Sequence, residues 1–465
     1  MILFSEIRIR QSSWLPLGCR YGTAFCKTVF RRIFMLKISG CGDILIAGHL
    51  PEGKYNGFEE MRDFLMSHDV RFGNLETTVH RNEGYPSLFP GGGYALADPD
   101  VLDDVREYGF NLLSIANNHS LDYSHKGLEA TIGYLKEKRF AFAGAGMNLA
   151  EAAAPCYIET RNGRAALIAV TSSFHDSDAA GSQSVDMNGR PGVNPLRHSE
   201  VLQVTPELMN AVQQIAAGTG INEYRDLGAK NGYVMQNKNV KLRDVQFTEG
   251  DEIKKISTAA KRDLDRVVSR INEARAQADC VIVSVHGHQF KGTDNYPDDF
   301  IVEFCHAVID AGADIVFCHG AHVIRGIEKR GNGIIFWGLG DFIMKNELQT
   351  KLPADFYEKY SIPYEYYDNV GMAMNIRSKD GTVGMCANSK VWESFIPSIE
   401  FDIEEKKVVS VKLYPISLHF ELPRSRRGWP ELVDNKEIFT ELEAISGNFE
   451  TPVKISAENG YGLVL

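Results

Sequence analysis

Five short polar motifs hold most of the residues that could do chemistry in this 465-residue chain. Each follows an apolar, strand-like run, and together they supply carboxylates, an amide and imidazoles: Gly42-Asp43, Asn74-Leu75-Glu76, Asn117-Asn118-His119, His286-Gly287-His288 and His319-Gly320-Ala321-His322. This mixture of ligand types suits divalent ions such as Mn, Zn or Fe. The motifs therefore predict a site for one or two divalent metal ions.

The expected metal ligands are Asp43, Glu76, Asn118, His286, His319 and His322. A two-metal site needs a carboxylate that bridges the ions, and Glu76 is the natural candidate. Asn118 would contribute a neutral amide oxygen, which limits the accumulated negative charge. Singly, each motif also has a plainer explanation, because Gly-Asp is usually a turn and a lone His after a strand is usually structural. Their joint occurrence after several strands favours the metal site.

His119 is expected to have a different role from its neighbour Asn118. It could point away from the metal ions and donate a proton to a leaving group, with Asp122 orienting its ring. The motifs therefore predict hydrolytic chemistry, in which His119 and Asp122 are the catalytic pair.

The elements that must position these residues form an alternating series of strands and helices. Strands are expected at residues 36–40, 70–73, 111–116, 140–143, 165–171, 280–285, 315–318 and 334–337. Helices are expected at residues 57–67, 99–108, 125–138, 253–276 and 297–311. This alternation is typical of a layered α/β domain, in which the carboxyl ends of the strands form the ligand crevice.

The remaining segments break this rhythm. Residues 1–34 are a basic tail that we expect to lie outside the fold, and residues 35–345 form the main domain. Within it, polar and turn-rich residues 174–250 are expected to be a long insertion. Residues 346–465 begin with an aromatic segment and continue as a β-rich extension, with a strand near 408–414 and a helix over 434–445 that Asp434 could cap.

Composition narrows the possible partners. A net charge of −11 argues against a general nucleic-acid or anionic-membrane binder. The 8 cysteines show no C-x-x-C pattern and are expected to be free thiols. No apolar stretch long enough for a membrane span and no clear export signal is visible, which favours a cytoplasmic location.

A Gly- and Pro-containing stretch over residues 189–197 offers a possible anion-binding loop. Arg190 and Arg197, with Asn194 between them, are the expected substrate-binding residues, because guanidinium groups bind carboxylate or phosphate through paired hydrogen bonds. The alternative is a solvated loop with no ligand.

The same motifs resemble a known family, the CapA or poly-gamma-glutamate synthesis proteins, whose fold is similar to that of calcineurin-like metallophosphoesterases. The resemblance covers about residues 36–345. Besides the five motifs it includes Gly144-Ala145-Gly146, Gly312-Ala313-Asp314 and Gly338-Leu339-Gly340-Asp341-Phe342. It implies a four-layer α/β/β/α sandwich, and it implies the metal-ligand and proton-donor roles given above.

Two positions depart from the pattern of that superfamily. Leu45 stands where a metallophosphoesterase has the His of Asp-x-His, which questions a fully occupied two-metal site. His288 could be a replacement ligand or a bystander.

The resemblance implies a metal-dependent hydrolase that cleaves a phosphoester or a gamma-glutamyl or other amide bond. Its substrate would be an anionic small molecule or poly-gamma-glutamate, in capsule biosynthesis or processing. By analogy with the family, an extracytoplasmic location is also open. The alternative is a non-catalytic accessory protein that binds or exports the capsule polymer.

Overall fold

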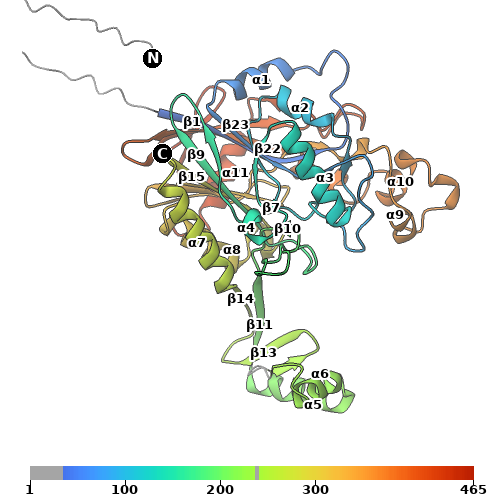
Figure 1. Cartoon of the computed structure of the whole chain (residues 1–465). Coiled ribbons are helices and arrows are strands. Elements are labelled where there is room, and N and C mark those ends of the chain that lie inside the picture. Colours follow the sequence, from blue (N-terminus) through green and yellow to red (C-terminus); the bar gives the residue numbers. More distant parts are fainter. Residues whose placement is uncertain (1–34, 236–239) are drawn as a thin grey trace, which may run out of the picture. The chain divides into compact units, whose positions relative to one another are not determined.

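The computed structural model describes residues 35–235 and 240–465, so the predicted basic tail lies outside the described residues. Two β-sheets dominate the fold (Figure 1). The first is 10-stranded, with eight strands along its path and β21 and β24 beside β1 and β23. The path runs β25 (Ile455–Ala457), β26 (Gly462–Val464), β23 (Lys407–Ser417), β22 (Glu393–Asp402), β1 (Met35–Ile46), β2 (Val70–Leu75), β5 (Leu112–Ser114), β6 (Ala141–Ala143), and the two flanking strands are β21 (Asp341–Lys345) and β24 (Glu431–Leu432).

The second sheet is 6-stranded and carries the later motifs. Its order is β19 (Ile327–Arg330), β20 (Gly333–Phe336), β18 (Ile315–His319), β15 (Cys280–His286), β9 (Arg164–Thr171), β8 (Cys156–Glu159). The four central strands are parallel, and the two edge strands are antiparallel to their neighbours. Parallel strands buried on both faces read as continuous apolar runs, which explains why these were predictable from the sequence.

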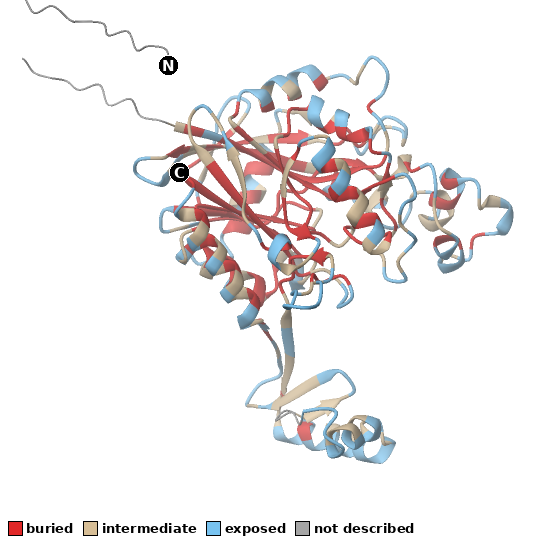
Figure 2. Ribbon diagram, viewed as in Figure 1, coloured by how far each residue is buried: buried red, intermediate tan, exposed pale blue. Residues whose placement is uncertain are grey.

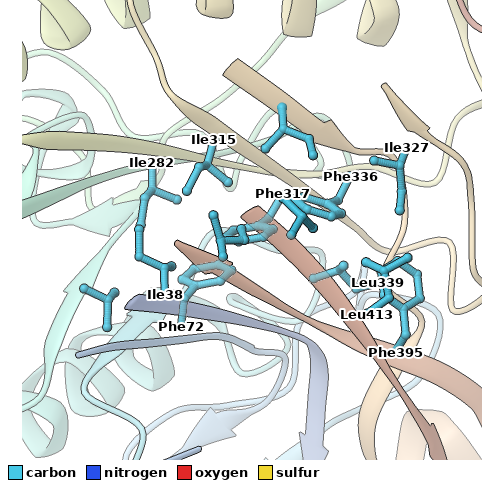
Figure 3. Packing of buried hydrophobic residues seen from close by; sticks show 14 of the residues in the cluster. Ile38, Phe72, Ile282, Ile315, Phe317, Ile327, Phe336, Leu339, Phe395 and Leu413 are labelled. Atoms are coloured by element: carbon cyan, nitrogen blue, oxygen red, sulfur yellow. The ribbon is translucent and has the colours of Figure 1, made fainter. Parts of the chain in front are cut away.

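The two sheets pack face to face around one apolar core. Figure 3 shows side chains from both sheets meeting there, including Phe72 from β2 and Phe317 from β18. Their rings stack with centroids 5.1 Å apart. Figure 2 shows that these strands are buried along most of their length.

Helices cover the outer face of each sheet (Figure 1). On the first sheet lie α1 (Phe58–Met66), α2 (Val101–Glu107) and α3 (Ser124–Glu137), and on the second lie α7 (Lys261–Arg275) and α8 (Asp299–Asp310). The helix α8 buries Phe300, Phe304 and Val308, which are spaced four residues apart and so share one face. The layer order is α/β/β/α, and the predicted fold class is confirmed.

The segment between β9 and α7 differs from the predicted helix over 253–276. It contains a 4-stranded sheet of β12 (Val240–Leu242), β13 (Val245–Glu249), β11 (His198–Val204) and β14 (Lys254–Ala259), with helices α5 (Pro206–Thr219) and α6 (Glu223–Lys230). The helix prediction was therefore wrong over its first turns, because β14 alternates exposed and buried side chains in antiparallel pairing with β11.

The chain after β21 forms the expected aromatic segment and the β-rich extension. The segment contains α9 (Ala354–Lys359) and α10 (Val370–Arg377), and the extension supplies β22 and β23 to the first sheet. The last helix, α11 (Glu437–Ser446), begins after Lys436. Asp434 therefore does not cap it, and the Asn435 side chain accepts the hydrogen bond from the Glu437 N–H instead.

Candidate metal centre and its pocket

The predicted ligands converge where strands of both sheets end. Asp43 pairs with Asn74 of β2 on one side and with Asp341 of β21 on the other. In the second sheet His286 pairs with His319 at the ends of β15 and β18. The strand β1 is longer than predicted, so Asp43 lies within it rather than after it, next to a register shift between Gly40 and Asp43.

Glu76 and Asp43 occupy the middle of this cluster. The Glu76 Oε1 atom lies 3.6 Å from His286 Nε2, 3.8 Å from His322 Nε2 and 4.0 Å from His119 Nε2. Asp43 Oδ1 lies 3.3 Å from His319 Nδ1, and Asp43 Oδ2 lies 3.7 Å from His322 Nδ1. Side chains from distant parts of the sequence thus surround one small volume.

Many ligand-type atoms of this cluster are buried without a hydrogen-bond partner. They are both carboxylate oxygens of Glu76, Oδ1 of Asn118, Nε2 of His286, Nε2 of His319 and Oδ2 of Asp341. An unpaired buried polar atom is costly, and native structures rarely contain several together. These atoms are of the kinds that would donate electron pairs to a bound cation.

Two triads define where such a cation could bind. One is Glu76, His286 and His288, and the other is Asp43, His322 and Asp341; within each triad the ligand atoms lie within 4.8 Å of one another. A third triad, His306, Glu328 and Glu450, meets the same distance limit. This third triad differs from the first two, because its Glu328 already pairs with His306 at 3.0 Å and accepts a hydrogen bond from Thr451 at 3.1 Å.

The charges of the cluster are poorly balanced without a cation. Burial, helped by the neighbouring Asp43 carboxylate, raises the pKa of Glu76 well above its ordinary value. Burial lowers the pKa of His286 well below its ordinary value and that of His288 to about 3, so both rings are neutral and able to bind metal. Against the effect of burial, Asp341 and Glu76 raise the pKa of His322 to about 10. The carboxylates thus attract positive charge to this point.

The turn after β18 requires an unusual backbone. His322 has φ +55°, and Gly320 has φ +89°, where a Cβ atom would lie 2.9 Å from His286 Nε2. The Gly320 N–H also donates to Asp43 Oδ2 at 3.0 Å. A glycine at position 320 therefore lets the turn pass close to the candidate metal ligands.

Asn74 holds the first-sheet part of the cluster in place. Its Nδ2 donates to Asp43 Oδ1 at 2.7 Å, and its Oδ1 accepts from Asn117 Nδ2 at 3.2 Å. Asn118 Nδ2 donates to the Gly91 carbonyl at 2.7 Å, which leaves Asn118 Oδ1 as the atom without a partner. This orientation suits the predicted role of Asn118 as a neutral oxygen ligand.

The predicted proton donor lies at the edge of the cluster. His119 Nδ1 lies 2.6 Å from Asp122 Oδ2, and Asp122 is fully buried. The Asp122 carboxylate also accepts hydrogen bonds from the Gly91 N–H at 2.8 Å and the Ala95 N–H at 2.7 Å. Asp122 therefore fixes the His119 ring with Nδ1 engaged and Nε2 free.

A pocket of about 260 Å³ opens beside the cluster. Asn118, His119, His288 and His322 are among the residues that line it. His288 is held by Ser173, whose Oγ lies 2.9 Å from His288 Nδ1. The pocket gives a substrate access to both the candidate metal ligands and His119 Nε2.

The predicted substrate-binding loop does not join this site. The Arg197 guanidinium pairs with Asp263 of α7 at 3.0 Å. The Asn194 side chain is fully buried and is used by the Ala169 carbonyl and by Arg266. Arg190 donates from Nε to the Ala179 carbonyl. None of the three residues lines the pocket beside the cluster, and their role in substrate binding stays a prediction.

Sequence reasoning assigned no role to Asp341 and Asn74, although both belonged to motifs that it recognised. A usable signal was the Gly340-Asp341 step, which repeats Gly42-Asp43 and also follows an apolar run. In the structure Asp341 Oδ1 lies 2.8 Å from His322 Nδ1. Asp341 thus places a second carboxylate next to Asp43. Leu45, by contrast, has no group that could bind a metal ion.

The chain is similar to several known proteins. The chain is 29% identical over 435 residues to the uncharacterized protein y4sH of Sinorhizobium fredii, covering 91% of each. It is 25% identical over 316 residues to the capsule biosynthesis protein CapA of Bacillus anthracis, covering 66% of this chain and 59% of CapA.

Solved structures resemble this fold only at low sequence identity. A novel phosphatase of Mycoplasma pneumoniae matches with 12% identity and a TM-score of 0.38, covering 83% of this chain and 94% of its own. A hypothetical protein of Thermus thermophilus matches with 11% identity and a TM-score of 0.36, covering 82% of this chain and 98% of its own.

Among the described residues no helix is long and apolar enough to cross a membrane. The family model "Bacterial capsule synthesis protein PGA_cap" matches residues 37–346, which is more than half of the sequence, and the chain therefore belongs to this family.

Proposed function

We propose that this protein is a metal-dependent hydrolase that cleaves a phosphoester or a gamma-glutamyl or other amide bond. The observation that carries the proposal is the group of buried ligand atoms without partners, on Glu76, Asn118, His286, His319 and Asp341, beside an open pocket. If the cluster were purely structural, these buried atoms would stay without hydrogen bonds and would lower the stability of the fold.

The residues that would hold one or two divalent ions are Asp43, Glu76, Asn118, His286, His319, His322 and Asp341, with His288 able to join them. Glu76 is central because its Oε1 faces three imidazoles. When bound, such ions polarise a substrate oxygen and lower the pKa of water. The neutral rings and the mixed oxygen and nitrogen donors favour Mn, Zn or Fe over Ca or Mg.

His119 supplies the proton in this proposal. Its Nδ1 is held by Asp122, so Nε2 is the atom that faces the pocket and can protonate a leaving group. Because Asp122 is fixed by two backbone N–H groups, the ring needs no reorganisation when a substrate enters. His119 is thus the proposed catalytic acid and Asp122 its positioning residue.

The family and the CapA relatives support a place in capsule biosynthesis, with poly-gamma-glutamate or a related anionic molecule as substrate. Both bond types remain compatible with the site, since each presents an oxygen to polarise and a leaving group to protonate.

An activity screen tests the proposal. The full chain, supplied with Mn, Zn or Fe, is assayed with phosphomonoesters, phosphodiesters and gamma-glutamyl peptides, beside H119A and the control H49A. His49 is a good control because it lies on the surface, paired only with Asp104. We expect hydrolysis of at least one class, a loss of about 10²-fold or more in H119A, and no change in H49A. A metal-loaded protein that binds polyglutamate and cleaves no substrate would support an accessory role instead.

A further inference from the structure

The pocket has a second wall, which belongs to the segment between β21 and β22. This segment, residues 346–392, carries α9 and α10, and we call it the cap. Its apolar side chains form a cluster of their own with two tyrosines of the main domain: Phe356, Tyr357, Ile362, Val370, Ala373 and Met374 pack with Tyr94 and Tyr123. Tyr123 directly follows Asp122, so the cap rests on the chain that positions His119.

Hydrogen bonds also join the cap to the floor of the pocket. Tyr94 Oη donates to the Ser87 carbonyl at 2.6 Å and lies 3.5 Å from Asp355 of α9. The Leu96 N–H donates to Gln349 Oε1 at 3.2 Å. The position of the cap beside the candidate metal centre is therefore fixed by both apolar and polar contacts.

Arg377, the last residue of α10, extends into this pocket. Of the residues that line the pocket, it alone carries a permanent positive charge. Its guanidinium makes no hydrogen bond or ion pair with any described residue. Its guanidinium carbon lies 5.4 Å from the Tyr360 ring centroid and 5.9 Å from that of Phe356, so aromatic rings support it.

Arg377 is half-buried, and its guanidinium has no partner among the described residues. Arg424, which lines an adjoining pocket together with Arg377, shows the ordinary arrangement, since its Nε lies 2.6 Å from Glu347 Oε2. A guanidinium supported by ring faces keeps its N–H edge available for an oxyanion. Gly93, which also lines the pocket, lies beside this guanidinium, since a Cβ atom added there would lie 3.8 Å from Arg377 Nη1.

We propose that Arg377 binds a second acidic group of the substrate, a carboxylate or phosphate oxyanion in the part of the molecule that is not attacked. This inference rests on the proposed function, because it places the scissile bond at the candidate metal cluster, whose residues line the same pocket as Arg377. Arg377 would thus select substrates with a further negative charge near the cleaved bond. Unlike Arg190 and Arg197, Arg377 lines the pocket.

Binding measurements test the role of Arg377 separately from hydrolysis. The full chain is titrated by calorimetry with gamma-glutamyl-glutamate and with inorganic pyrophosphate, which distinguish a carboxylate from a phosphate. The variants are R377M, R377K and the control K359M, which removes another cation of the cap that lies 5.6 Å from the Tyr360 ring and does not line the pocket. Thermal unfolding of each variant confirms that the cap remains folded.

We expect R377M to bind at least one probe about 10- to 100-fold more weakly, as for the loss of a charge-assisted hydrogen bond. R377K should lose less, since it keeps the charge but not the planar fork, and K359M should bind as the wild type does. Equal binding by R377M and wild type, or no binding of either probe by the wild type, would overturn the inference. If binding depends on Arg377 but no substrate is hydrolysed, only the proposed function is contradicted. If a substrate is hydrolysed but binding is the same in R377M and wild type, only this inference is contradicted.

Discussion

The most informative perturbation of the proton-donor pair is D122N. In the wild type the Asp122 carboxylate accepts three hydrogen bonds, from the Gly91 N–H, the Ala95 N–H and His119 Nδ1. An asparagine offers one oxygen and one NH₂ group, so in its best orientation the NH₂ group faces the Gly91 N–H. One buried donor is then unsatisfied, and the other two bonds lose their charge. Together these changes should lower the free energy of unfolding by about 2–4 kcal/mol.

The effect of D122N on catalysis follows from the same geometry. In the orientation given above the amide oxygen still accepts from His119 Nδ1, but it carries no negative charge and holds the ring by a weaker hydrogen bond. Because general acid catalysis contributes about 10²–10⁴-fold, we expect kcat to fall by at least about 10²-fold. Urea unfolding measures the first effect, and steady-state kinetics on the substrate found in the screen measure the second.

A double-mutant cycle decides whether Asp122 acts through His119. If it does, D122N should change kcat little in an H119A background, because the ring that it positions is already gone. Equal and additive losses in both backgrounds would refute the reasoning. A D122N protein with wild-type kcat would refute it as well.

Three further predictions concern the scaffold. In G42A the added Cβ would lie 1.9 Å from the Gly340 carbonyl oxygen, so we expect a loss of about 1–3 kcal/mol in unfolding free energy and a lower metal content. F317A removes a ring from the centre of the core between the sheets and should cost about 3–5 kcal/mol, measured by urea unfolding. Burial lowers the pKa of His68 below 6.5, so the unfolded chain takes up this proton first and stability should fall as the pH drops below about 6.5. H68Q should show a shallower fall between about pH 7 and pH 5.

Much of the fold was predictable because its strands are buried on both faces. Runs such as β15 and β18 are continuously apolar and end in the polar motifs, so both the strands and their ligands could be found in the sequence. The strand β14 was missed because it alternates Lys, Ser and Thr with few apolar residues and depends on its pairing with β11. The conformation of β14 is therefore determined by its pairing with β11 and not by the pattern of its own residues.

The site shows the same division between local and distant information. The order of the motifs was enough to predict the cluster. The ion pair of Arg197 could not be predicted in this way, because its partner Asp263 lies on a helix far along the chain. Arg377 gave no signal because a lone arginine at a helix end is ordinary. It becomes notable only when the fold places it in the same pocket as His119, without a side-chain hydrogen bond or ion pair among the described residues.

The metal content of E76Q tests the central claim most directly. The matched control is E328Q, because Glu328 is also a fully buried glutamate beside a histidine, but its oxygens already have protein partners. Elemental analysis of protein prepared with Mn, Zn or Fe should find one or two ions per chain in the wild type and in E328Q, and at most half as much in E76Q. A wild type without metal, or an E76Q protein that retains its full content, would contradict the metal centre.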